Sequence, residues 1–106
     1  MAHIPEIQTC NSMAEVRQHI DALDERIVAL VAERSAYVAQ AARLKQHASQ
    51  VADPARVEFI VERVCRQAAA LGAPEAVVEA AYRAMIGASI AFEQREFARL
   101  REGAPS

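Results

Sequence analysis

The length, composition and charge of the chain limit what it can be. Its 106 residues suffice for one small domain, and with 53% hydrophobic and 25% charged residues it can bury a core. The net charge of -2 and the 5% of aromatic residues argue against nucleic-acid binding, which needs a basic excess or stacking platforms. Two cysteines are too few for a disulfide framework, and no apolar run approaches the ~20 residues that cross a bilayer. Because the start has no signal-peptide pattern, we expect a cytoplasmic protein that binds no membrane.

The first predicted helix runs from Met13 to about Gln46. Ser12-Met13-Ala14-Glu15 has the form of a capping box, in which the Ser hydroxyl accepts from one free backbone N–H and the Glu reaches back to another. No Pro or Gly follows until Pro54. Apolar residues recur at the three- and four-residue spacing of one helix face, namely Val16, Ile20, Leu23, Ile27, Leu30, Val38 and Ala41.

The length of this helix bears on the oligomeric state. At 1.5 Å per residue it is about 50 Å long, whereas a compact chain of this size has a radius of gyration of about 13 Å. The helix therefore extends beyond its own chain and carries apolar residues with it. A second copy is the simplest cover for them, so we expect an intertwined helical homodimer. The alternative is a break near Ala39–Ala42 that folds the helix back within one chain.

Two more helices follow. Residues 46–52 are predicted to be a connection, after which Asp53 and Pro54 have the pattern of an N-cap and a first-turn proline. Gly72 lies where a C-terminal glycine cap belongs. Pro74 and Glu75 open the third helix, and no strand-like alternation occurs anywhere. The fold class is therefore all-α, with three helices in one domain over residues 12–102 and tails at 1–11 and 103–106.

Two cations lie on the apolar face of the first helix. Arg34 follows Leu23 by three turns and lies within about 20° of it, and Lys45 follows Arg34 with the same offset. A buried charge is costly without a partner, and no acidic residue lies four positions away on this face. We therefore expect an anionic ligand. The alternative is that both stems lie on apolar surface and extend their charge into water.

Other polar residues extend this candidate site. Arg17 points about 100° away from Arg34, so it suits the pocket of a partner chain better than its own. Arg56 stands at the edge of the apolar face of the second helix. Ser89 and Glu93 are an inward pair at positions i and i+4 on the third helix, and Glu93 could simply neutralise Lys45. The three histidines, His3, His19 and His47, lack metal-ligand spacing and are expected on the surface.

The first helix carries a recognisable motif: Arg17-x-x-Ile20-Asp21-x-x-Asp24-x-x-Ile27-x-x-Leu30-x-x-x-Arg34, with Lys45 eleven residues further on and then Arg56. Over roughly residues 13 to 100 the chain resembles the all-helical (type II) chorismate mutases and their cousins, the isochorismate pyruvate lyases. The resemblance implies an interlocked dimer of three-helix chains with two sites. It also implies rearrangement of chorismate to prephenate in aromatic amino acid biosynthesis (the shikimate pathway), without metal or cofactor.

The resemblance assigns roles to the cations. Arg34 and the Arg17 of the partner chain would hold the two substrate carboxylates. Lys45 would donate to the ether oxygen and to the nearby carboxylate, and Arg56 would lie over the closed site. The [3,3] rearrangement needs only a compact substrate conformer and stabilisation of the charge that grows on the ether oxygen. Lys45, Glu93 and Arg34 are therefore the implied catalytic residues.

The same resemblance assigns the remaining polar residues and shows two departures. Asp53 and Ser89 would contact the ring hydroxyl and the ring carboxylate. Glu93 stands where most members have a glutamine that donates to the ether oxygen, so it must be protonated to act and activity should fall as the pH rises. Gln94 is the alternative donor if the helix is rotated by one residue. Val57 replaces a glutamate of many mutases, as in the lyases.

These departures leave three functions open. The first is a chorismate mutase. The second is an isochorismate pyruvate lyase, which forms salicylate and pyruvate from isochorismate. The third is a non-catalytic helical dimer of the same fold.

Overall fold

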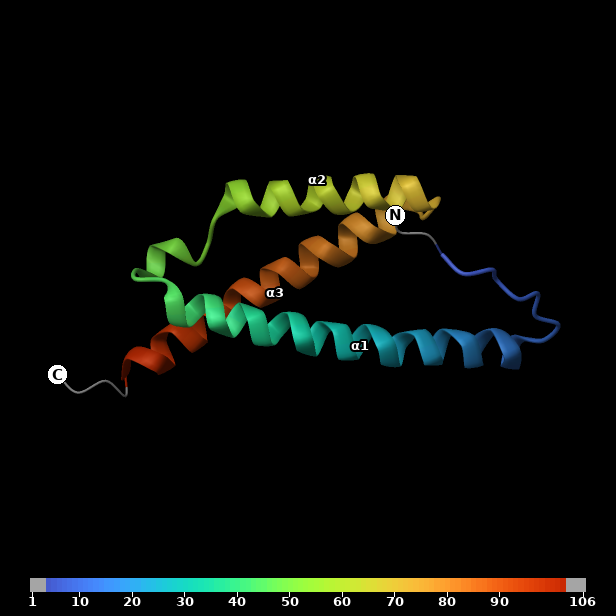
Figure 1. The fold of residues 1–106 in the computed structure, drawn as a ribbon, viewed down its shortest axis with the longest axis horizontal. Helices are drawn as coiled ribbons and strands as arrows, with labels where there is room; N and C mark the ends of the chain where they lie inside the picture. Colours follow the sequence, from blue (N-terminus) through green and yellow to red (C-terminus); the bar gives the residue numbers. More distant parts are fainter. Residues whose placement is uncertain (1–3, 103–106) are drawn as a thin grey trace.

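The computed structural model describes residues 4–102, which form three α-helices and one short 3₁₀-helix (Figure 1). These are α1 (Met13–Leu44), η1 (Ala48–Gln50), α2 (Pro54–Leu71) and α3 (Glu75–Glu102). No strand occurs among the described residues, so the prediction of an all-α chain with three helices is confirmed. Residues 1–3, which include His3, and the predicted tail at 103–106 lie outside the described part of the chain.

The start of α1 follows the predicted capping pattern with one difference. The Ser12 hydroxyl accepts from the Glu15 N–H at 3.2 Å. The Glu15 carboxylate, however, accepts from the N–H of Asn11 at 3.2 Å and not from that of Ser12. Both contacts satisfy backbone N–H groups that a helix start leaves without partners.

The end of α1 was predicted two residues too late. The helix ends at Leu44, and Lys45 is an extended cap residue (φ -70, ψ 143). The N–H groups of Gln46 and His47, which would continue the helix, donate instead to the Gln50 side-chain oxygen at 2.9 and 3.0 Å. A side chain from the following turn thus competes with the helical hydrogen bonds, which periodicity along α1 cannot reveal.

The boundaries of α2 agree with the prediction. The Asp53 side chain accepts from the Arg56 N–H at 3.2 Å, and Pro54 occupies the first turn. Gly72 ends the helix in the left-handed region at φ 71. α3 then begins at Glu75, and the carbonyl of Pro74 accepts from its first turn.

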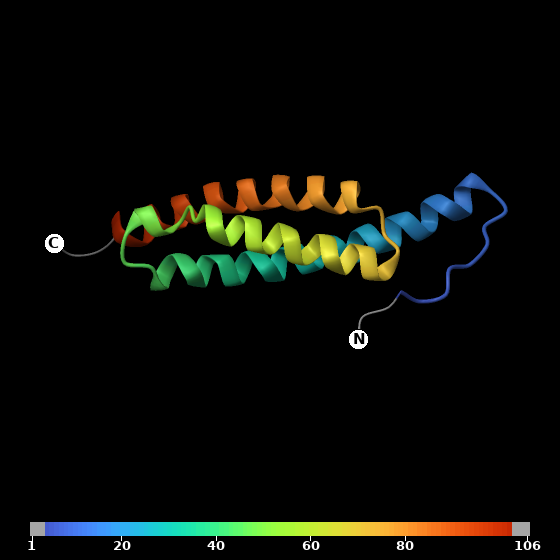
Figure 2. The ribbon, with the colours of Figure 1, turned by 90° about the horizontal axis from the view of Figure 1, so that it is seen from above.

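The helices are arranged around α3. Both α1 and α2 pack on α3, and within residues 4–102 they do not pack closely on each other (Figures 1 and 2). α1 is continuous through Ala39–Ala42, so the alternative of a break there is wrong. Its N-terminal end extends past the other two helices (Figure 2). The molecule is therefore elongated, at 63 × 27 × 22 Å with a radius of gyration of 17.7 Å, well above the value of about 13 Å for a compact chain.

The chain buries little of its apolar surface by itself. In the described residues the buried apolar side chains are Ala42, Val51, Val61, Ala68 and Ile86. The C-terminal part of the predicted α1 face, with Val38 and Ala41, is half-buried. In its N-terminal part, Ile20, Leu23, Ile27 and Leu30 are between 49% and 61% exposed. The apolar face of α1 is thus covered within the chain at one end only.

Candidate active site

A cavity of about 490 Å³ lies between the three helices and the η1 segment. Its volume is within the range of small-molecule sites. Apolar walls come from all three helices, including Val38, Ile60 and Ile90. The polar residues that line it are Arg34, Lys45, Gln50, Asp53, Arg56, Ser89 and Glu93, together with Tyr37. Every site residue predicted from the sequence except Arg17 therefore lies at one cavity.

Arg34 and Ser89 meet across the cavity. The Arg34 Nη1 donates to the Ser89 Oγ at 3.2 Å, and both residues are half-buried. Their elements are far apart in sequence, because Arg34 belongs to α1 and Ser89 to α3. A guanidinium has five N–H donors in a planar fork, so this one contact leaves Arg34 with donors for a carboxylate ligand.

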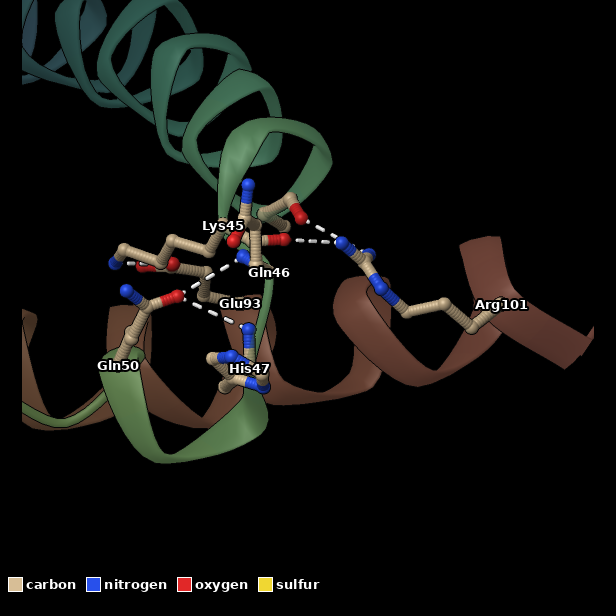
Figure 3. A network of polar contacts seen from close by, with 7 residues as sticks. Lys45, Gln46, His47, Gln50, Glu93 and Arg101 are labelled. Atoms are coloured by element: carbon tan, nitrogen blue, oxygen red, sulfur yellow. Dashed lines mark hydrogen bonds and ion pairs between the residues drawn. The ribbon is translucent and has the colours of Figure 1, made fainter.

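Lys45 and Glu93 form an ion pair at the end of the cavity nearest the C-terminus of α1 (Figure 3). The Lys45 Nζ lies 2.5 Å from the Glu93 Oε2. Glu93 is only 6% exposed, so its carboxylate is compensated by the ammonium as a buried charge requires. The alternative considered from the sequence, that Glu93 neutralises Lys45, describes this contact.

Glu93, and not Gln94, faces the cavity. Glu93 lines it and is buried, whereas Gln94 is exposed on α3. The contact with Lys45 defines this rotation of the helix, since the two side chains come from different elements.

The start of α2 contributes its N-cap residue Asp53 and, from the first turn, Arg56. One oxygen of Asp53 already accepts the N-cap hydrogen bond. Arg56 is exposed, and its guanidinium carbon lies 5.1 Å from the centre of the Phe59 ring, a distance at which a cation is attracted to the ring. Arg56 thus lines the cavity with its guanidinium over Phe59.

Arg17 does not reach this cavity. It is exposed on α1 and lies 17 residues before Arg34, which is about 25 Å along a straight helix. Five charged residues remain at the cavity: Arg34, Lys45 and Arg56 are cationic, and Asp53 and Glu93 are anionic. One chain alone thus offers a small cationic excess.

Two polar lining residues, Tyr37 and Gln50, were not predicted from the sequence. Tyr37 follows Arg34 by three positions and lies within about 60° of it, so the helix periodicity could have found it. Gln50 is in the irregular connection, where no periodic signal exists. Its side-chain oxygen accepts from the N–H groups of Gln46 and His47 (Figure 3), which links it to the end of α1.

Comparison with protein families gives a match over most of the chain. The family model described as chorismate mutase type II matches residues 16–94, which is most of the chain. The chain belongs to the type II chorismate mutase family. The matched range includes every predicted site residue from Arg17 to Glu93. A search of curated proteins gives no match.

Two further observations concern this member of the family. None of the helices that the structure describes is long and apolar enough to span a membrane. In residues 4–102, the His, Cys, Asp and Glu side chains do not form a group of three that could hold a metal ion.

Proposed function

We propose that this member of the family is a chorismate mutase, which converts chorismate to prephenate by an intramolecular [3,3] rearrangement. The observation that carries the proposal is the cavity in which Arg34 and Lys45 converge with Ser89 between apolar walls. Chorismate is a dicarboxylate, and such a cavity suits it in both charge and size. The substrate needs no nucleophile, because one C–O bond breaks and one C–C bond forms within the same molecule.

In this proposal the cavity works by holding one conformer and stabilising charge. The Arg34 guanidinium binds a carboxylate in a fork geometry and holds the substrate in its compact form. As the ether bond breaks, negative charge grows on its oxygen. The Lys45 ammonium has three donors and uses one for Glu93, so a second can stabilise this oxygen in a site of low dielectric.

A homodimer is part of the proposal. The chain exposes 8347 Å², whereas a compact protein of its mass exposes about 5,800 Å². Part of this excess surface belongs to the apolar row of α1, which consists of Ile20, Leu23, Ile27 and Leu30. A helix of similar length is needed to cover this row. A second copy packed there would bring its Arg17 to the cavity and raise the cationic excess to match a dicarboxylate.

Isochorismate pyruvate lyase activity is the second candidate. Val57 lines the cavity at the position where the family resemblance places a glutamate in many mutases and an apolar residue in the lyases. The retained Asp53 favours the mutase. A non-catalytic helical dimer is the third candidate.

One assay separates the three candidates. Purified protein is supplied with chorismate and with isochorismate in parallel, at two pH values, and prephenate and salicylate are measured. Prephenate from chorismate supports the mutase, salicylate from isochorismate supports the lyase, and neither product leaves only the non-catalytic dimer. Excess chelator should leave the mutase or lyase rate unchanged.

The Arg34→Ala variant ties the activity to the cavity. We expect it to lose about 100-fold or more in kcat/KM while it remains helical by circular dichroism. Arg43→Ala is the matched control, since Arg43 is exposed on the same helix and does not line the cavity. Equal rates for the Arg34→Ala variant and the wild type would remove the cavity from the reaction.

A further inference from the structure

Arg101, in the last turn of α3, binds the end of α1. Its Nη1 donates to the carbonyl oxygen of Ala42 at 3.0 Å and to that of Phe97 at 3.3 Å. Its Nη2 donates to the carbonyl oxygen of Lys45 (Figure 3). The guanidinium carbon also lies 3.5 Å from the centre of the Phe97 ring. Arg101 is half-buried, and its planar fork is thus held by carbonyl groups on one side and an aromatic ring on the other.

These contacts replace hydrogen bonds that α1 does not make. In a continuing helix the Gln46 N–H would donate to the Ala42 carbonyl, but here it donates to Gln50. Ala42 is 0% exposed, so its carbonyl needs a partner from the protein. Arg101 is that partner. The last turn of α1 is therefore completed by a residue that is 59 positions away in the sequence.

Lys45 is the residue that depends most on this arrangement. Its backbone is extended and lies just outside α1, so the helix holds it only through its N–H, which donates to the Ala41 carbonyl at 3.0 Å. Arg101 holds its carbonyl, and Glu93 holds its ammonium. Both partners belong to α3, so the backbone and the head of Lys45 are held by the same helix.

We infer that Arg101 is a positioning residue, which fixes the backbone of Lys45 so that its ammonium lies beside Glu93 and points into the cavity. This inference rests on the proposed function for the role of Lys45 but not for the geometry. A lysine side chain is long and flexible, and a displacement of about 1 Å can cost as much as 100-fold in rate. Loss of Arg101 should therefore act on Lys45 and not only on stability.

The sequence allows a direct measurement of Lys45, because it is the only lysine in the chain. Protein grown with nitrogen-15-labelled lysine gives one side-chain ammonium signal in a proton–nitrogen correlation spectrum. In the wild type the ion pair with Glu93 should slow proton exchange enough for this signal to be seen. In Arg101→Gln we expect the signal to shift and broaden or to disappear.

Arg99→Gln is the matched control. Arg99 lies in the same last turn, is exposed, and pairs with Glu96 at 2.9 Å. Its replacement removes an arginine from the same end of α3 without a contact to α1, so the Lys45 signal should stay in place.

Kinetics provide the second readout. Arg101→Gln should lower kcat by about tenfold or more with a smaller change in KM, since the ammonium acts on charge that develops in the transition state. Arg101→Lys should recover part of kcat, because an ammonium can bind one of the two carbonyls. Rates are divided by the folded fraction from circular dichroism. The Gly72→Ala variant strains the C-terminal cap of α2, which is far from the cavity. It therefore shows how far a loss of stability alone changes the rate.

The outcomes are distinct. A displaced Lys45 signal in Arg101→Gln, with Arg99→Gln unchanged, supports the positioning role even if neither substrate is turned over, in which case only the proposed function fails. An unchanged Lys45 signal in Arg101→Gln overturns the inference, as does an unchanged kcat where the wild type is active. If Arg101→Gln does not fold, the kcat of Arg101→Lys per folded protein is compared with that of Gly72→Ala. A lower value for Arg101→Lys supports the inference, whereas equal values would mean that Arg101 has a structural role only.

Discussion

Glu93 is the site residue whose observed contact differs most from the role that the family resemblance implies for it. A carboxylate beside the ether oxygen would repel the charge that develops there, so as a donor Glu93 must carry a proton. In the structure it instead accepts from Lys45 at 2.5 Å. The two roles require opposite protonation states, and the pH dependence of the reaction distinguishes them.

The prediction for Glu93 follows from this difference. If the protonated form donates to the substrate, that form becomes scarcer as the pH rises, so kcat of the wild type should fall. The Glu93→Gln variant, whose amide donates at every pH, should show a flat profile over the same range. Stopped assays of both proteins across the pH range provide the measurement. Parallel profiles for the two proteins would assign Glu93 to orienting Lys45 instead.

Site residues on regular helix faces or at the caps next to them could be predicted from the sequence, whereas Gln50 and Arg101 could not. Arg34, Ser89 and Glu93 occupy positions that the helical period places inward, and all three line the cavity. Gln50 and Arg101 act through contacts to an irregular segment, and Arg101 reaches across 56 residues to Lys45. Such contacts depend on tertiary packing, which a period along the chain does not contain.

The ends of the helices show the same division. The starts of α1 and α2 and the end of α2 were predicted because a local side chain or a glycine defines each of them. The end of α1 was missed because Gln50 and Arg101 define it from outside the helix. Local chemistry is readable in the sequence, whereas capping by a distant residue is not.

The two described glycines should respond oppositely to the same substitution. Gly72 has φ +71, and Gly87 lies inside α3, with open space around the position of an added methyl group at both. Gly72→Ala should therefore lose about 1 kcal/mol through backbone strain alone. Gly87→Ala should gain about 0.8 kcal/mol from helix propensity. Urea unfolding followed by circular dichroism measures both, and a gain at Gly72 would contradict the left-handed cap.

A surface network joins α2 to α3 and should make stability depend on pH. Arg83 donates to both oxygens of Glu58 at 3.0 and 3.2 Å, and to Glu79 at 2.9 Å. The hydrogen bond from Arg83 and its charge lower the pKa of Glu58 below its ordinary value of 4.5. The contribution is therefore complete above about pH 4.5 and is lost as the pH falls through the lowered pKa.

Melting temperatures test this linkage. Arg83→Met should melt below the wild type at neutral pH, and the gap should narrow as the pH falls below 4.5. Arg95→Met, at an exposed site on the same helix, should show no such narrowing. If the difference in melting temperature between Arg83→Met and the wild type stays constant with pH, the lower stability of the variant comes from lost packing and not from the ion pair.

At the scale of the whole molecule, the proposed site is complete only with two chains. Arg17 is remote from the cavity of its own chain, and the apolar row of α1 is exposed. The sequence predicted this length and this exposed row from the period of α1 alone. The partner itself stays a prediction, because which surfaces of two copies meet depends on both copies together.

Mixed dimers test the sharing of Arg17. Arg17→Ala and Arg34→Ala should each be nearly inactive alone. After subunit exchange, half of the dimers contain one chain of each kind, and each such dimer has one intact site. The mixture should therefore recover about one quarter of the wild-type rate. A mixture as inactive as its parents, with exchange verified by mass spectrometry, would place both arginines in the same chain's site.

The proposed dimer should depend on the exposed apolar row of α1, namely Ile20, Leu23, Ile27 and Leu30. Leu23→Glu places a charge in the middle of that row and should give a monomer by light scattering, with loss of activity. Val77→Glu is the control, because Val77 is similarly exposed but lies on α3. A dimeric Leu23→Glu variant would exclude this row as the interface.

The separate packing of α1 and α2 on α3 has a consequence for the breadth of substrates. Arg34 belongs to α1, whereas Asp53 caps α2 and Arg56 lies in its first turn. Since these two helices pack on α3 and not closely on each other, a small sliding of α2 changes the aperture between the two groups without breaking an α1–α2 contact. In the proposed function, the residues assigned to a substrate carboxylate and those assigned to the ring hydroxyl therefore lie on helices that can shift separately, and we expect this to accommodate rings with the hydroxyl at different positions.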